Sequence, residues 1–232
     1  PVMTLPYGST QMSCRQYMRE FIGDNALHFN VVGDDKAQWK LASWGSKLMW
    51  AAIKACVIAA REAMEWLQTC ISKLSAHGVN ARWLSPADFP VYQHYREHEM
   101  IDVQTSLFGR LRLKVEGPPA GLSKYRARNG IAPNYVHSLD SSHMVMCINT
   151  GALEGLTAMH LIHDDFGVHA ADTERWWQII RDVFVWMYTR KDWLLAWKHE
   201  IEALHEGLEL PEPPSTGDLD IKEVRNSQYF FG

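Results

Sequence analysis

Apolar residues recur at helical spacing along much of this chain, and the pattern predicts several long helices. A first helix is predicted over residues 11–22, and the longest helical pattern covers residues 38–76, with an expected break near Gly45. Asp172 is a favourable N-cap for a strongly apolar helix, and a further helix covers residues 193–206. We interpret residues 38–76 as the scaffold helix of the fold.

The scaffold helix also carries a row of cations. Its apolar face is predicted to run from Trp44 to Cys70, and cations recur every seven residues on the opposite face. These cations are Lys40, Lys47, Lys54 and Arg61. Such a row can follow a phosphate backbone, although a solvated helix face explains it as well.

Strand patterns occupy the middle of the chain. Residues 82–95 predict a hairpin, and residues 107–115 alternate in a way that predicts one buried face and one basic face with Arg110, Arg112 and Lys114. The glycine- and proline-rich residues 117–121 predict a loop.

Two histidines in this region, His94 and His98, are possible metal ligands. The sequence shows no third ligand near them, so a surface pair is the simpler interpretation.

Polar side chains are concentrated in the stretch NGIAPNYVHSLDSSH, residues 129–143. A helix is predicted from Pro133 to Asn149, which places His137, Ser138 and, one turn later, two more serines along one side. This side is either a ligand-binding surface or the buried, hydrogen-bonded face of a structural helix.

Two adjacent carboxylates, Asp164 and Asp165, lie between two short extended segments. Residues 156–162 are predicted to form a strand and residues 168–170 a returning strand, which places the acids at the tip of a hairpin. A carboxylate held on a rigid turn can bind a divalent cation with little reorganisation, as phosphoryl transfer requires. We select Asp164 as the candidate catalytic residue; an exposed acidic turn is the alternative.

Composition limits the possible functions. The chain has 232 residues, 47% of them hydrophobic, and a net charge of -4, which excludes a wholly basic nucleic-acid-binding surface. Its four cysteines form no C-x-x-C pair and are predicted to be free thiols. No apolar run is long enough to span a membrane and no signal peptide is recognisable. Because the chain begins with Pro1, we expect it to be part of a longer protein.

Taken together, VMTLPYGST, NGIAPNYVHSLDSSH, LIHDDFGVHAAD and the terminal YFFG resemble the C-terminal part of single-subunit DNA-dependent RNA polymerases of bacteriophages and mitochondria. The resemblance implies an α+β fold, with long helices around a small antiparallel sheet, as the C-terminal fingers and palm part of a right-hand polymerase. Residues 1–78 would be the end of the fingers helix and the scaffold helices. Residues 79–125 would be a β insert and loop, and residues 126–232 the palm with the catalytic hairpin and C-terminal tail.

The resemblance also implies individual roles. Asp164 resembles the second of two palm aspartates that hold two Mg²⁺ ions for nucleotidyl transfer, and Asp165 would lie behind it or face solvent. Tyr7 is similar to the tyrosine that helps to select ribose, and Gly8 would allow the backbone to approach template or substrate. His137 resembles a histidine that contacts the ribose 2′-hydroxyl or the minor groove. Phe231–Gly232 would be the aromatic tail that returns toward the active site.

The implied partners are the DNA template, the nascent RNA, nucleoside triphosphates and the N-terminal remainder of the polymerase. This chain would be inactive alone because no residues in it resemble the first catalytic aspartate motif. The resemblance implies the cytoplasm of the host cell for a phage polymerase and leaves a mitochondrial location open.

Three other functions remain as alternatives. One is the palm of a related DNA polymerase of family A, and another is a non-catalytic nucleic-acid-binding module that uses the cations described above. The third is a metallohydrolase built on Asp164 with His160, His163 and His169, but strand alternation places these residues on opposing faces.

Overall fold

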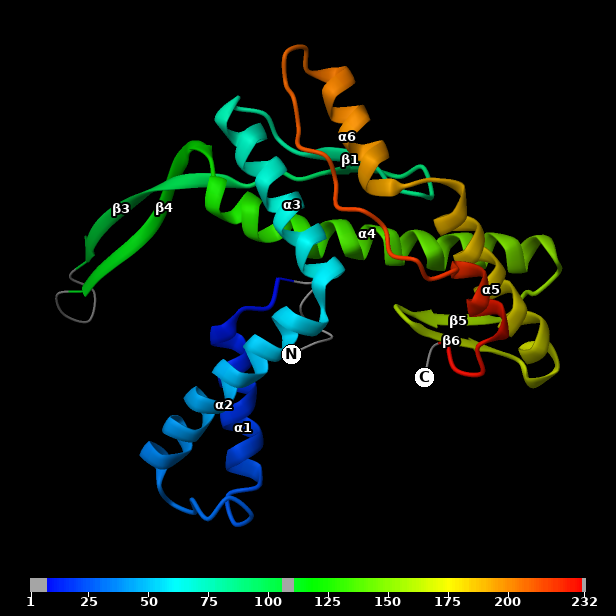
Figure 1. Ribbon diagram of the computed structural model, residues 1–232. Coiled ribbons are helices and arrows are strands. Elements are labelled where there is room, and N and C mark those ends of the chain that lie inside the picture. Colours follow the sequence, from blue (N-terminus) through cyan, green and yellow to red (C-terminus); the bar gives the residue numbers. More distant parts are fainter. Residues whose placement is uncertain (1–7, 106–110, 231–232) are drawn as a thin grey trace.

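The computed structural model of the chain describes residues 8–105 and 111–230 and is organised around one long helix, α4 (Lys124–Leu153). Helix α3 (Ile58–Ala76) crosses α4 near the middle of the molecule, and helix α5 (Thr173–Arg190) lies at the C-terminal end of α4 (Figure 1). Helix α6 (Trp193–Leu204) packs next to strand β1 (Arg82–Leu84) (Figure 1).

Helices α1 (Gln11–Asp24) and α2 (Asp35–Cys56) form an antiparallel pair that extends away from the rest of the molecule (Figure 1). The first helix confirms the predicted one and begins at a capping box between Thr10 and Ser13. A Cβ atom on Gly45 would lie 2.5 Å from the Cε atom at the end of the Met18 side chain, so Gly45 is a point of contact between α1 and α2.

The long helical pattern of residues 38–76 is divided into α2 and α3, with the break at Val57 rather than near Gly45. The predicted apolar face is wrong for α2, where Trp44 is 62% exposed and the buried positions are Ala42, Gly45, Ser46 and Ile53. The prediction holds in the second half of α3, where Trp66 and Cys70 are buried, but not at its start, where Ala59 is exposed.

The predicted row of cations is likewise divided. Lys40, Lys47 and Lys54 lie on α2, whereas Arg61 lies on α3 and forms an ion pair with Glu65 at 3.7 Å. No single straight helix therefore carries the four positive charges.

The strands form three separate antiparallel hairpins in the described residues, rather than the one small sheet that was expected. The first pairs β1 with β2 (Pro90–Tyr92) and confirms the hairpin predicted over residues 82–95. The helices and antiparallel strands together confirm the α+β class.

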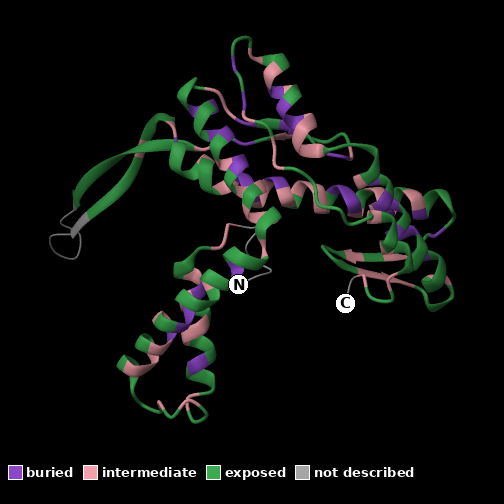
Figure 2. Ribbon diagram, in the orientation of Figure 1, coloured by how far each residue is buried: buried purple, intermediate pink, exposed green. Residues whose placement is uncertain are grey.

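The second hairpin, of β3 (Arg96–Thr105) and β4 (Leu111–Leu122), projects from the end of the molecule opposite α5 (Figure 1). Residues 117–121 belong to β4, so the predicted loop is wrong. The predicted buried face is also wrong, because Leu113 and Val115 are 45% and 47% exposed and the described part of the hairpin is exposed throughout most of its length (Figure 2). Arg110 lies outside the described residues.

Helix α4 begins at Lys124, well before the predicted start at Pro133, because the Ser123 side chain accepts a hydrogen bond from the Arg126 backbone and caps the helix. Pro133 lies inside the helix and has no N–H to donate to the Asn129 carbonyl. Gly8 lies at this point: a Cβ atom on it would be 3.7 Å from the Asn129 oxygen.

The chain after α4 follows the predicted order. Strands β5 (Met159–Ile162) and β6 (Asp165–Val168) form the third hairpin, and a short 3₁₀ turn, η1 (Ala170–Asp172), leads into α5. Asp172 occupies the N-cap position of α5 without a side-chain hydrogen bond to the helix. The last helical segment, η2 (Ile221–Asn226), is capped by Asp220.

Most buried apolar residues form two clusters, and a few others lie in α1 and α2 (Figure 2). The larger joins α3, α4, β1 and α6 around four aromatic residues, Trp66, Trp83, Tyr135 and Trp197. The smaller joins α4, α5 and the β5–β6 hairpin around Cys147, Trp176 and Ile179. Within the described residues, none of the helices has the length and apolar character needed to cross a membrane.

Candidate active site

Asp164 lies at the tip of a very tight hairpin. Ile162 pairs with Asp165, so only His163 and Asp164 form the turn. His163 adopts a left-handed backbone conformation with φ of 55°, which a two-residue hairpin turn favours because its twist matches that of the strands. The Asp164 side chain is exposed at this tip. The sequence therefore predicted the hairpin and the place of Asp164 at its tip. The turn is shorter than predicted, because the returning strand already begins at Asp165.

Phe166 fixes the hairpin to the helices. Its ring lies 5.9 Å from the ring of His143 on α4 and 6.1 Å from that of Trp176 on α5, measured between centroids. Met159, Leu161 and Val168 pack against the same cluster, which gives the hairpin an apolar underside. The backbone that carries Asp164 is thus held both by these tertiary contacts and by the hydrogen bonds between β5 and β6.

Helices α4 and α5 approach closely beneath the hairpin. A Cβ atom on Gly151 would lie 2.7 Å from the ring of Trp176, so glycine is needed for this separation. At the surface, Glu154 after the end of α4 forms an ion pair with Arg175 of α5. Both contacts hold the two helices in fixed register under the catalytic candidate.

His143 has a structural position in this support. Its Nε2 atom lies 2.9 Å from the Ile180 carbonyl oxygen and 3.4 Å from the Cys147 sulfur, and burial lowers the pKa of the imidazole. Burial also raises the pKa of the Cys147 thiol to about 12. A neutral histidine beside a protonated thiol is suited to packing rather than to nucleophilic catalysis.

Asp164 borders a cavity of about 470 Å³, which we call the hairpin cavity. It is lined by Asp164, Asp165, Phe166, Trp177, Ile180, Arg181 and Gln228. The two carboxylates make no hydrogen bond or ion pair with another described residue, so their oxygen atoms are available to a ligand. Arg181, by contrast, is buried at 5% exposure.

These carboxylates fit a magnesium ion only in part. Mg²⁺ prefers oxygen ligands and is commonly held by one or two carboxylates together with water and substrate phosphates. Asp164 and Asp165 can supply that number, but no group of three or more ionisable metal ligands occurs in the described part of the chain. His160, His163 and His169 therefore do not gather around Asp164 as a metallohydrolase would require.

His94 and His98 also have separate surroundings. His94 accepts a hydrogen bond from the Arg96 Nε atom at 2.6 Å, whereas His98 lies 3.2 Å from the Gly117 carbonyl oxygen.

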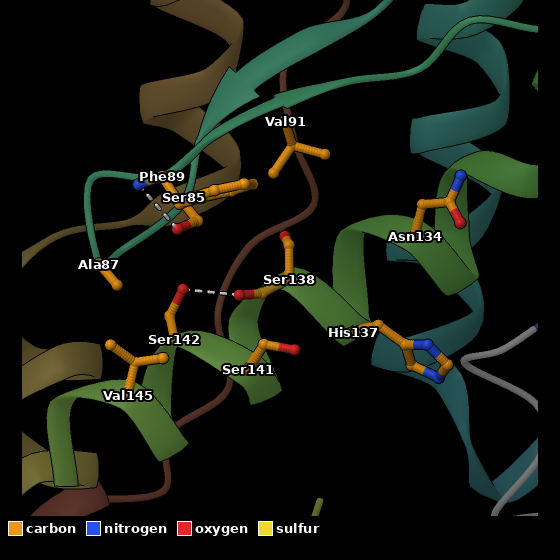
Figure 3. Close-up of a pocket in the computed structure, with 10 residues that line it drawn as sticks. All are labelled: Ser85, Ala87, Phe89, Val91, Asn134, His137, Ser138, Ser141, Ser142 and Val145. Atoms are coloured by element: carbon orange, nitrogen blue, oxygen red, sulfur yellow. Dashed lines mark hydrogen bonds between the residues drawn. The ribbon is translucent and has the colours of Figure 1, made fainter. Parts of the chain in front are cut away.

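A second cavity, of about 430 Å³, lies between α4 and the β1–β2 turn (Figure 3). We call it the serine groove, after the serines of α4 that line it. Its lining residues are Ser85, Ala87, Phe89, Val91, Asn134, His137, Ser138, Ser141, Ser142 and Val145. The structure thus confirms that His137 and the serines share one side of the helix. Figure 3 shows the His137 ring directed away from the serines, at the end of the groove.

The serines of the groove are largely committed to internal hydrogen bonds. Ser138 Oγ accepts a hydrogen bond from Trp83 Nε1 at 2.8 Å and donates one to the Tyr135 carbonyl oxygen at 2.7 Å. Ser142 Oγ donates to the Ser138 carbonyl oxygen at 2.6 Å. These two hydroxyl groups can therefore accept hydrogen bonds from a ligand but have no proton left to donate. The segment is internally hydrogen-bonded, as a structural helix face would be, and it also lines a groove.

The predicted catalytic and substrate-binding residues that the structure describes fall into two places. Gly8, with φ of 82°, lies against α4 at Pro133, one helical turn before His137. Asp164 lines the hairpin cavity, which shares no lining residue with the serine groove. Tyr7 and Phe231–Gly232 lie outside the described residues. Helix α4 connects the two places, because His143, on the same helix as His137, contacts the hairpin through Phe166.

The sequence interpretation missed three residues of the hairpin cavity, Trp177, Arg181 and Gln228. One signal was present: Arg181 interrupts the apolar pattern of α5 between Ile180 and Val183. No comparable signal marks Gln228, which reaches the cavity only through the path of the last residues.

The chain is similar in sequence to known RNA polymerases. The family model for DNA-dependent RNA polymerase matches residues 1–207. The polymerase of Enterobacteria phage K11 is 29% identical over 253 residues, covering 99% of this chain and 28% of that protein. RNA polymerase 3 of Nicotiana sylvestris chloroplasts is 32% identical over 233 residues, covering 99% and 23%. The chloroplast and mitochondrial RNA polymerase 2 of Arabidopsis thaliana is 31% identical over 230 residues, covering 99% and 22%.

This chain spans about a quarter of the length of these relatives, and they come from both phages and plant organelles. The family model covers most of the chain, including the hairpin and the whole of α4. The chain therefore belongs to the family of DNA-dependent RNA polymerases that bacteriophages and organelles share.

Proposed function

We propose that this chain forms part of the catalytic centre of an enzyme that makes RNA from ribonucleoside triphosphates on a DNA template. The single observation that carries the proposal is the placement of Asp164 at the tip of a two-residue turn, supported by Phe166 and facing a cavity. In the reaction, the 3′-hydroxyl of the nascent RNA attacks the α-phosphate of the incoming nucleotide and pyrophosphate leaves. Such chemistry needs positive charge beside the reacting phosphates, and rigidly placed carboxylates provide it by holding metal ions.

Asp164 would hold such an ion as a magnesium ligand, with Asp165 next to it in the same cavity. Bound Mg²⁺ supplies a Lewis acid for the phosphate oxygens and activates the attacking hydroxyl group. The role of the chain itself is to fix the carboxylate. The paired strands and the contacts of Phe166 with α4 and α5 limit the motion of the turn, so little reorganisation is needed when the substrate arrives.

His137, Gly8 and Tyr7 would form the side of the centre that recognises ribose. A 2′-hydroxyl is both a hydrogen-bond donor and an acceptor, and an imidazole ring can satisfy either role. Gly8 lies against α4 at Pro133, one helical turn before His137. The serine groove beside His137 offers an apolar wall and acceptor oxygen atoms.

The fold would then be the palm and adjoining fingers part of a right-hand polymerase. Residues 1–78 would contain the end of the fingers, residues 79–125 an insert, and residues 126–232 the palm. The relatives are about four times as long as this chain, so the remaining ligands and most of the template contacts would come from the rest of the polymerase.

The test is the substitution Asp164→Asn in the complete polymerase. It removes the charge and keeps the size, so RNA synthesis should fall at least about 1,000-fold while the affinity for DNA stays within about twofold. The matched control is Asp165→Asn, in the adjacent residue of the same cavity, which should lose much less activity. Near-normal RNA synthesis by the Asp164→Asn enzyme would contradict the proposal.

A further inference from the structure

Arg181, in the middle of α5, is a buried cation without a carboxylate partner among the described residues. Its Nη1 atom donates to the Trp177 carbonyl oxygen at 3.1 Å, and its Nη2 atom donates to the Ser227 carbonyl oxygen at 3.2 Å. The Nε–H group is buried and has no hydrogen-bond partner. Burying an unpaired charge is costly, so a structural purpose is expected for this residue.

Aromatic rings partly compensate the charge. The guanidinium carbon lies 3.6 Å from the centre of the Trp177 ring and 5.5 Å from that of Phe230. Stacking on an aromatic face stabilises an arginine more when the pair is shielded from water. Arg181 therefore contacts α5 on one side and the last described residues of the chain on the other.

The segment that Arg181 holds, residues 227–230, is placed at the candidate active site. Gln228 lines the hairpin cavity together with Asp164. The Phe230 ring lies 4.8 Å from that of Phe184 and packs on the cluster that includes Phe166 and Val168 of the hairpin. Tyr229, between them, is 80% exposed and adds little. The segment is thus held at two points, Ser227 and Phe230, and Arg181 contacts both.

The segment just before it is held independently. Arg225 Nε of η2 donates to Asp182 Oδ1 of α5 at 2.6 Å, at the surface. Loss of Arg181 would leave this upstream anchor in place and release only the residues that reach the cavity.

We propose that Arg181 is a positioning residue for the reaction at Asp164: it fixes residues 227–230 as one wall of the hairpin cavity and, through Phe230, as a support for the hairpin. This inference rests on the proposed function, since it assigns a catalytic purpose to the geometry around Asp164. Arg181 itself contacts residues 227–230 and does not contact the substrate. Its guanidinium group holds a backbone carbonyl and two rings at once, which a lysine cannot reproduce.

The test replaces Arg181 with Met in the complete polymerase, and Arg190→Met is the matched control. Arg190 also stacks on the tryptophan four residues before it, with its guanidinium carbon 4.8 Å from the Trp186 ring centre. Unlike Arg181, it is exposed and forms no hydrogen bond or ring contact with the described residues 227–230. We expect Arg181→Met to lower kcat about tenfold or more and to leave the KM for nucleotides within about twofold. Amide hydrogen exchange in residues 227–230 should become faster. Arg190→Met should change neither quantity.

Two further variants keep the test decisive. Arg181→Lys preserves charge and bulk and should recover part of kcat; it also carries the test if the methionine variant does not fold. The double variant Arg181→Met with Phe230→Ala should be little worse than the poorer single variant, because both changes release the same segment.

Several outcomes would overturn the inference. Faster exchange with unchanged kcat would make Arg181 a tail anchor without a part in the reaction. A raised KM with unchanged kcat would mean that Arg181 binds the substrate directly, and additive losses in the double variant would separate it from the tail. If Asp164→Asn stays active, the proposed function fails; if Asp164→Asn is inactive and Arg181→Met is fully active, only this inference fails.

Discussion

The hairpin cavity and the serine groove are similar in size. Helix α4 lines the groove and supports the hairpin of the cavity through His143. The two sites differ in whether their polar groups are already hydrogen-bonded. In the hairpin cavity, Asp164 and Asp165 keep unpartnered carboxylates at the surface. In the serine groove, the hydroxyl groups of Ser138 and Ser142 already donate hydrogen bonds to carbonyl oxygens of the helix backbone. Unused charge suits a site that must bind ions or reacting phosphates, whereas satisfied hydroxyl groups suit a preformed surface that recognises shape. This difference supports the proposal that the first cavity takes part in the chemistry and the second in recognition.

The largest difference is expected between two phenylalanines, one in each cavity. Phe166→Ala removes the contacts that hold the hairpin on His143 and Trp176, and Asp164 would lose its fixed position. We expect RNA synthesis by the complete polymerase to fall about 100-fold, since small displacements of reacting groups are costly. The unfolding free energy of the chain should fall by about 2–3 kcal/mol, less than for a fully buried ring.

The control for that experiment is Phe89→Ala in the serine groove, where the ring is 67% exposed. Its unfolding free energy, measured by urea denaturation, should change by less than about 0.5 kcal/mol, and its rate of RNA synthesis should be affected far less. Equal losses of rate in the two variants would remove the distinction between the cavities.

A smaller effect of a different kind is expected at His137. The change His137→Ala should reduce the preference for ribonucleotides over deoxynucleotides about tenfold, the equivalent of one lost hydrogen bond. The kcat for ribonucleotides should fall less than the preference does. Competition between the two substrates on one template measures both quantities, and Ser141→Ala, also on the exposed side of the groove, is the control. A fall in kcat with unchanged preference would place His137 with the catalytic group instead.

The smallest effect is the pH dependence that His143 of α4 gives to stability. Burial lowers the pKa of His143 in the folded chain, so the unfolded chain, with a histidine pKa of about 6.5, binds the proton more readily. The unfolding free energy should consequently decrease as the pH falls below about 6.5 and should be constant with respect to this group at higher pH. Urea denaturation between pH 5 and 8 measures this slope.

His143→Gln should flatten that slope, although it also lowers stability at every pH through the lost contact with the Ile180 carbonyl oxygen. Parallel curves for wild type and His143→Gln would exclude the buried histidine as the cause.

Local patterns predicted the site better than they predicted the framework. The hairpin around Asp164 follows from alternation and a short polar turn, both of which are local signals, and the shared side of His137 and Ser138 follows from helical spacing. Arg181 could not be assigned from sequence, because its importance depends on residues 227–230, which meet it only in the folded chain.

Tertiary contacts explain the errors in the framework. Gly45 indicated a helix break, but it is a point of contact with Met18, and the break occurs at Val57, a residue without such a signal. Pro133 indicated a helix start, whereas the Ser123 cap begins α4 earlier and Gly8 lies where the proline disrupts the hydrogen-bond ladder. Glycine and proline mark unusual backbone positions, but neighbours that are distant in sequence decide what each position is for.

The two-residue turn of the β5–β6 hairpin constrains how such an enzyme can vary. Successive strand residues face opposite sides, so one residue added between Ile162 and Asp165 would either shift the pairing or turn the acid away from the cavity. A change of residue at His163 disturbs only the local backbone, whereas a change in the number of residues misdirects the carboxylate itself. Loop length, more than loop composition, is therefore the property that evolution or a redesign of this enzyme has to preserve.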